Sequence, residues 1–293
     1  MLKQRIISGV LLGGMCVAVA NYLPSPACWL LLVGITALAQ YEFYSMLDKA
    51  GLPVFRILGI LSGAAVISAT FWTIGPDATQ LAAGYRWENL VILATVMIVF
   101  VRQFPQKHND RPIVTIAVTL LGVWYVAFLM NYLTRLAFGW RDAGMMHSVG
   151  PTGRMMIIYL VAVVKMSDVG AFFTGRSLGR HKLFPRLSPK KTIEGLAGGI
   201  VSSIVVSLLF FWLTDGALGK VHFGIHDAII LGILLPVVGV LGDLFESLLK
   251  RTAGIKDSGT LIPGMGGVLD VLDSLLFGAP VLYAYVSLFL SAG

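Results

Sequence analysis

Apolar residues dominate the chain in long runs that short polar gaps separate. A helix needs about 20 consecutive, mostly apolar residues to cross the hydrocarbon core of a bilayer. About nine runs approach this length, and two of them, at 88–104 and 112–134, have the least distinct ends. The sequence therefore predicts an all-α fold, a polytopic transmembrane bundle of about nine helices. The expected spans are 6–23, 27–47, 54–75, 88–104, 112–134, 155–175, 195–214, 227–249 and 268–290.

Composition agrees with this pattern. Hydrophobic residues make up 57% of the chain and charged residues 13%, with a mean hydropathy of +0.83. Because soluble domains carry about 25% charged residues, the composition argues against an ordinary soluble protein. No repeat, low-complexity tract or long linker divides the chain. We expect one integral membrane domain, 1–293, in which 1–150 supplies scaffold helices and 155–275 carries the chemistry.

The basic residues predict how the bundle is oriented. Most of the 22 Lys and Arg residues lie at the N-terminus and in alternate gaps, all on one side of the expected bundle. The positive-inside rule places that side, with the N-terminus, in the cytoplasm. Because the number of expected spans is odd, the C-terminus then lies outside. A cytoplasmic side of this kind implies a plasma or inner membrane. Because the net charge of +7 is distributed in this way, it favours anionic lipid headgroups and not nucleic acid as the partner.

Acidic residues enter the later apolar runs at helical spacing. Asp168 lies within 155–175, and Asp243 and Glu246 lie within 227–249. Asp270 and Asp273 begin the last run. An acidic residue at the centre of a span costs about 2.5–3.5 kcal/mol, and residues three apart share a helix face. If these faces meet, the carboxylates converge near the cytoplasmic end and favour Mg²⁺.

Ordinary ion pairs are an alternative explanation for part of this pattern. Asp243 and Asp270 have no cationic neighbour on their own helix face, which favours a metal at these two positions. Other acidic residues have a lysine three or four positions away and can pair with it. These pairs are Lys165–Asp168 and Glu246–Lys250.

Two loops add features that suit phosphate groups. Glycines precede the last span, where backbone can approach a ligand and free N–H groups of a helix N-terminus favour anions. A basic loop at 188–195 precedes the span at 195–214. This loop is explained either by the positive-inside rule together with a helix cap, or by binding of a nucleoside triphosphate.

Ordered motifs in the second half of the chain resemble those of the phosphatidate cytidylyltransferase family, also called CDP-diacylglycerol synthase. Between 247 and 273 the chain reads Ser-Leu-Leu-Lys-Arg, then Lys-Asp four residues later, then Pro-Gly-Met-Gly-Gly and Asp-Val-Leu-Asp. Segments 167–176, 188–195 and 242–247 also match. The resemblance covers residues 160–275, whereas the N-terminal half matches only in hydropathy. Met265 replaces the family's histidine, and Val271 replaces an arginine.

The resemblance implies transfer of a cytidylyl group from CTP to phosphatidate. It implies that Asp243 and Asp270 hold Mg²⁺, and the sequence leaves a second, monovalent cation open. Asp168 and Asp273 would support these ligands or hold that second cation. Helix bundles of this kind can form homodimers, although no stretch identifies an interface. The remaining implied residues are Lys250, Arg251, Lys256 and Asp257 for catalysis, and Arg176, Ser188, Lys190, Lys191, Thr192, Ser247, Gly266 and Gly267 for substrate binding.

Other functions remain open at this point. A related CTP-using lipid enzyme, such as a polyprenol kinase or a CDP-archaeol-type synthase, would share many of these residues. A kinase would release CDP, whereas a cytidylyltransferase releases pyrophosphate. A transporter also carries buried charges, but such proteins more often show repeated halves. Met265 and Val271, which depart from the family signature, would favour a non-catalytic relative.

Overall fold

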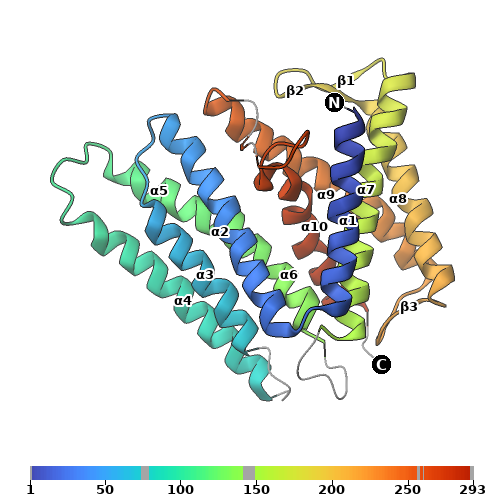
Figure 1. Cartoon of the computed structure of the whole chain (residues 1–293), viewed down its shortest axis with the longest axis horizontal. Helices are drawn as coiled ribbons and strands as arrows, with labels where there is room; N and C mark the ends of the chain where they lie inside the picture. Colours follow the sequence, from blue (N-terminus) through green and yellow to red (C-terminus); the bar gives the residue numbers. More distant parts are fainter. Residues whose placement is uncertain (1, 74–78, 141–148, 256–257, 260, 291–293) are drawn as a thin grey trace.

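The computed structural model describes residues 2–73, 79–140, 149–255, 258–259 and 261–290 of the chain (Figure 1). Helices account for nearly all of the regular structure. Two short antiparallel hairpins join helices at opposite ends of the bundle. The elements are α1 Leu2–Tyr22, α2 Ser25–Lys49, α3 Arg56–Thr73, α4 Thr79–Gln103, α5 Pro112–Gly122, η1 Val123–Phe128, α6 Leu129–Phe138, α7 Pro151–Leu178, β1 Lys182–Phe184, β2 Ser188–Thr192, α8 Ile193–Leu213, β3 Ala217–Leu218, β4 Val221–His222, α9 Ile225–Thr252 and α10 Val268–Phe289.

The observed helices confirm the all-α membrane bundle. Seven helical stretches are long and apolar enough to cross a bilayer, so the protein is an integral membrane protein. One of them is continuous from Pro112 to Phe138 and contains α5, η1 and α6. The expected spans at 6–23 and 88–104 overlap α1 and α4, which are not among the seven. The count of about nine spans therefore stays a prediction.

Local sequence signals set where several helices begin. Proline lies in the first turn of α2, α5 and α7, where its missing N–H costs no hydrogen bond. Helix α8 begins at a side-chain cap, because Thr192 Oγ1 accepts a hydrogen bond from Gly195 N at 3.1 Å. This cap joins β2 directly to α8 and so fixes the hairpin against the bundle.

The helices form two groups that meet in the middle of the molecule (Figure 1). Helices α2 to α6 make up one side, and α7 to α10 make up the other, with α1 lying against α7. Helix α1 begins at the end of the bundle that carries β1 and β2, whereas α10 ends at the opposite end. The hairpin and the turn between α9 and α10 therefore share one end of the bundle with the start of the chain.

Close packing in the second group depends on small residues. A Cβ on Gly170 of α7 would lie 2.8 Å from the carbonyl oxygen of Gly198 in α8, and one on Gly242 of α9 would collide with the Asp273 carbonyl of α10. Small residues let helix backbones approach closely within a membrane. Helices α9 and α10 therefore meet where Asp243 and Asp273 lie.

The π-helical segment η1 packs against this pair. Tyr125 lies in η1, and its ring centroid is 4.8 Å from that of Phe245 in α9 and 6.4 Å from that of Phe277 in α10. A π-helical turn is wider than an α-helical one and often occurs near functional sites. Its buried ring brings the N-terminal helices against the two that carry Asp243, Glu246 and Asp273.

A buried polar cluster lies among the N-terminal helices. Glu88 of α4 forms an ion pair with Arg135 of α6, and Glu88 accepts a hydrogen bond from Thr70 of α3 at 2.9 Å. Asn131 donates to the same threonine at 2.8 Å. The Arg135 guanidinium also lies 5.6 Å from the ring centroid of Tyr283 in α10. Among the described residues, one acid and one base therefore balance each other within this cluster.

Candidate active site

One face of α9 carries the predicted stripe of polar side chains. Ser247 Oγ donates to Asp243 Oδ1 at 3.3 Å, and Lys250 Nζ lies 2.6 Å from Glu246 Oε2. Both contacts join residues four apart, as the helical spacing predicted. The Glu246–Lys250 ion pair, which helical spacing offered as an alternative explanation, is therefore present. Glu246 is fully buried.

Three carboxylates from two helices converge at this stripe. Oxygens of Asp243 and Glu246 in α9 and of Asp273 in α10 all lie within 4.8 Å of one another. Asp273 is buried with Glu246, and Asp243 is half-buried. The convergence expected from the two helix faces is therefore present, with Glu246 as a member.

The composition of this carboxylate cluster (Asp243, Glu246, Asp273) fits a hard divalent cation. Glu246 Oε1 is buried and accepts no hydrogen bond within the described part of the chain. An unpartnered buried carboxylate oxygen is costly, and three close carboxylates repel one another. Mg²⁺ prefers oxygen ligands and takes few of them from protein, leaving its other positions to water and substrate phosphates. The residues present thus fit the cation that the sequence predicted.

Lysines from three elements surround the carboxylate cluster. Lys191 Nζ of β2 lies 2.6 Å from Asp243 Oδ2. Lys165 of α7 forms the ion pair with Asp168 that the helical spacing allowed, at 3.6 Å. It also donates a hydrogen bond to the Val271 carbonyl oxygen at 2.9 Å. Thus the cation near Asp243 comes from the hairpin, which the spacing on α9 alone did not indicate.

Asp270 lies apart from the three grouped carboxylates and has its own set of donors. Its Oδ1 accepts from Lys250 Nζ at 2.7 Å. Its Oδ2 accepts from Ser258 N at 3.0 Å, Ser258 Oγ at 2.8 Å and Gly267 N at 2.7 Å. The sequence paired Asp270 with Asp243 as metal ligands, but the structure groups Asp243 with Glu246 and Asp273. A metal role for Asp270 stays a prediction.

Glu42 of α2 is a member of this site that the sequence reasoning missed. Its carboxylate is buried and accepts from Val268 N at 3.0 Å and from Leu269 N at 2.9 Å. Ser258 Oγ lies 3.3 Å from the same group. The sequence could have indicated Glu42, because it is an acidic residue within the apolar run at 27–47. The later aspartates were identified by the same criterion.

Tyr125 of η1 is a second missed residue. Its hydroxyl is buried and has no hydrogen-bond partner among the residues that the structure describes. The ring packs on Phe245, one residue before Glu246, so the N-terminal helices contribute polar atoms near the carboxylates as well as scaffold.

The hairpin presents its predicted substrate-binding residues in alternation. Lys190 is exposed, Lys191 reaches Asp243, and Thr192 is buried as the cap of α8. Ser188 is half-buried where β2 begins. Glu194 accepts from the backbone N–H of His181 and lies 2.6 Å from its Nδ1, which closes the base of the hairpin.

Further predicted residues lie at the same end of the bundle. Arg176, near the end of α7, and Arg251, near the end of α9, are both exposed. Gly266 has φ +107°, which favours glycine, and Gly267 donates to Asp270. Lys256 and Asp257 lie outside the described residues.

The two departures from the family signature have different surroundings. The Val271 carbonyl accepts the Lys165 hydrogen bond, a role that any residue can fill. A Cβ on Gly9 of α1 would lie 3.4 Å from Met265 Cε, so this methionine extends toward α1.

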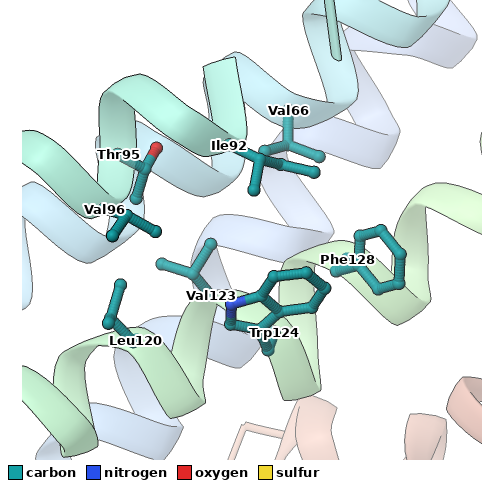
Figure 2. Close-up of a pocket in the computed structure, with 8 residues that line it drawn as sticks. All are labelled: Val66, Ile92, Thr95, Val96, Leu120, Val123, Trp124 and Phe128. Carbon is teal, nitrogen blue, oxygen red and sulfur yellow. The ribbon is translucent and has the colours of Figure 1, made fainter. Parts of the chain in front are cut away.

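A small apolar pocket lies elsewhere, between α3, α4, the end of α5 and η1 (Figure 2). Its lining includes no charged side chain and therefore does not suit a nucleotide or phosphate. The lining residues are Val66, Ile92, Thr95, Val96, Leu120, Val123, Trp124 and Phe128.

Comparisons with known proteins agree with these motifs. A phosphatidate cytidylyltransferase of Synechocystis is 33% identical, over 98% of this chain and 97% of its own length. One from Staphylococcus haemolyticus is 30% identical over 86% of this chain and 91% of its own. One from Helicobacter pylori is 48% identical over 45% of this chain and 47% of its own. The pattern of the cytidylyltransferase family matches residues 3–289, and this chain belongs to that family.

Proposed function

We propose that the protein transfers a cytidylyl group from CTP to phosphatidate in phospholipid biosynthesis. The products are CDP-diacylglycerol and pyrophosphate. The observation that carries this proposal is the carboxylate cluster ringed by Lys165, Lys191 and Lys250 at one end of a membrane bundle. Family membership and relatives that bear this activity in their names support it.

The reaction needs positioned charges more than a protein nucleophile. An oxygen of the lipid phosphate forms a bond to the α-phosphorus of CTP, while the bond from that phosphorus to the β-phosphate oxygen breaks. Pyrophosphate leaves with the electron pair. Basic side chains stabilise charge that develops on the phosphate oxygens, and orientation supplies much of the remaining rate.

The chain divides this work between exposed and half-buried cations. Arg176, Lys190 and Arg251 are exposed at the hairpin end, and we assign them to contact the triphosphate. Lys191 and Lys250 are held by carboxylates and keep positive charge close to the reacting phosphates. Positioned cations of this kind need no rearrangement when charge develops.

Mg²⁺ is part of the proposal. Asp243, Glu246 and Asp273 would hold it, because their oxygens are grouped and one is unpartnered. When bound, the ion acts as a Lewis acid toward phosphate oxygens. The prediction that Asp168 supports the metal ligands or holds a second cation is compatible with its ion pair to Lys165 beside this group.

The proposed orientation places the hairpin end of the bundle in the cytoplasm of a plasma or inner membrane. That end carries Arg176, Lys182, Lys190 and Arg251, and CTP is a cytoplasmic metabolite. The positive-inside rule supports this direction. The lipid phosphate lies at the same interface.

Two labelled forms of CTP test the activity and its main alternative together. Purified protein in detergent is given phosphatidate, Mg²⁺ and CTP labelled at either the α- or the γ-phosphorus. Cytidylyl transfer moves only the α-label into lipid and releases pyrophosphate, and EDTA abolishes it. Lipid labelled only from γ-phosphate would contradict the proposal and indicate a kinase. No labelled lipid from folded protein would favour a non-catalytic relative or an enzyme with another lipid acceptor, and repeating the assay with a polyprenol separates these two.

A further inference from the structure

The first turn of α10 is occupied by protein carboxylates. Helix N-termini leave backbone N–H groups without intrahelical partners, and these groups commonly bind phosphate. Here Gly267 N donates to Asp270, Val268 N donates to Glu42 Oε1 and Leu269 N donates to Glu42 Oε2. Three successive donors are therefore already satisfied before any substrate arrives.

The Glu42 carboxylate comes from α2, more than 200 positions earlier in the chain. It is 4% exposed, and both of its oxygens accept from α10 backbone. A buried carboxylate is costly unless it is hydrogen-bonded, and charge-assisted bonds to N–H groups are roughly twice as strong as neutral ones. These bonds therefore join the C-terminal half of α2 firmly to the start of α10.

The glycines beside this contact are explained by Glu42 itself. A Cβ on Gly259 would collide with Glu42 Oε1, and a Cβ on Gly267 would collide with Glu42 Oε2. The sequence suggested that Gly266 and Gly267 leave room for a substrate phosphate. At Gly267 the room is taken by the Glu42 carboxylate.

We infer that Glu42 is a positioning residue for nucleotidyl transfer. By docking the first turn of α10 on α2, it fixes Asp270 and Asp273 relative to Asp243 and Glu246 on α9. It also excludes substrate phosphates from the N–H groups of Val268 and Leu269. This role rests on the proposed function, because it concerns the geometry of that site.

The first test replaces Glu42 with Gln, which has nearly the same shape. An amide has one acceptor oxygen, so it can satisfy only one of the two N–H groups and presents its own N–H₂ to the other. We expect kcat to fall by about 10- to 100-fold, since small misplacement of reacting groups can cost about that much. KM for CTP and for phosphatidate should change by less than about threefold, because in the proposed role Glu42 holds α10 and does not bind substrate.

Gln40→Leu is a matched control on the same helix. Gln40 is also buried and donates to the carbonyl oxygens of Gly59 and Gly122, away from α10. This variant should lower thermal stability and leave kcat per folded molecule unchanged. Glu42→Gln with wild-type kcat, or with a loss no larger than that of Gln40→Leu, would overturn the proposal.

A change from the opposite side covers the case in which Glu42→Gln does not fold. Gly267→Ala crowds the Glu42 carboxylate without removing it. The same selective loss of kcat supports the proposal, and a folded Gly267→Ala protein with wild-type kcat overturns it.

Hydrogen–deuterium exchange separates this proposal from the activity itself. If the wild-type protein makes no CDP-diacylglycerol, the proposed function fails and exchange decides the role of Glu42. Faster exchange of the amides at 268–269 in Glu42→Gln, with no change in α3, supports the docking role. Unchanged exchange at 268–269 overturns it.

Discussion

Two buried charge clusters in this bundle differ in their balance. In the Glu88–Arg135 cluster, one acid meets one base, and Thr70 and Asn131 extend the network. Around the carboxylate cluster, among the described residues, Asp243, Glu246, Asp270 and Asp273 outnumber Lys191 and Lys250, and the more exposed Lys165–Asp168 pair adds one charge of each sign. Burial alone does not mark a functional site in a membrane protein. A buried acid excess does, because a cation must offset it.

The largest expected effect comes from removing one acid of the excess. Asp273→Asn should reduce nucleotidyl transfer by more than about 1000-fold, since a Lewis-acid metal contributes several kcal/mol to the transition state. Without Mg²⁺, the variant should unfold at the same temperature as wild type or higher, because one repelling charge is gone. Pyrophosphate release and thermal unfolding in detergent measure the two quantities. Retained activity with Mg²⁺ would contradict the metal assignment.

Removing one member of the Glu88–Arg135 pair should have the opposite effects: a large loss of stability and no loss of activity. Arg135→Met leaves Glu88 buried and without its ion-pair partner, which costs about 3–5 kcal/mol of stability. The kcat of the remaining folded protein should not change, because the pair lies outside the site. The double variant Arg135→Met with Glu88→Gln should recover much of the lost stability. A double variant as unstable as the single one would show that the two clusters do not differ in this way.

Mg²⁺ should stabilise the wild-type protein through the carboxylate cluster alone. At a concentration of 100 times Kd, a ligand that binds only the folded state adds about 2.7 kcal/mol. Asp243→Asn should lose this shift, whereas Arg135→Met should keep it despite its lower starting stability. An equal Mg²⁺ shift in Asp243→Asn would place the cation elsewhere.

The same comparison explains what the sequence could predict. Helical spacing correctly placed Asp243, Glu246, Ser247 and Lys250 on one stripe, because that relation is local. Apolar run length likewise located most of the helices to within a few residues, because membrane thickness sets it, but α4 begins at Thr79 and not at the expected 88.

Contacts between distant elements could not be predicted in this way. Lys191 reaches Asp243 from a hairpin, and Glu42 reaches α10 from α2. Asp270 has no cation on its own helix face, yet it pairs with Lys250 of α9. Each of these partners depends on how helices pack, and spacing along one helix carries no information about it.

The smallest effect should come from the exposed ion pair Arg56–Asp48. Its N–O distance of 2.7 Å equals that of Lys250–Asp270, but the Asp48 side chain is 57% exposed and that of Asp270 is 7% exposed. Water and salt screen an exposed pair, so Asp48→Asn should cost less than about 1 kcal/mol and leave transfer activity unchanged. Thermal unfolding at low and high salt checks this. A large, salt-independent loss would mean that contact distance, and not burial and charge balance, decides what an ion pair contributes in this protein.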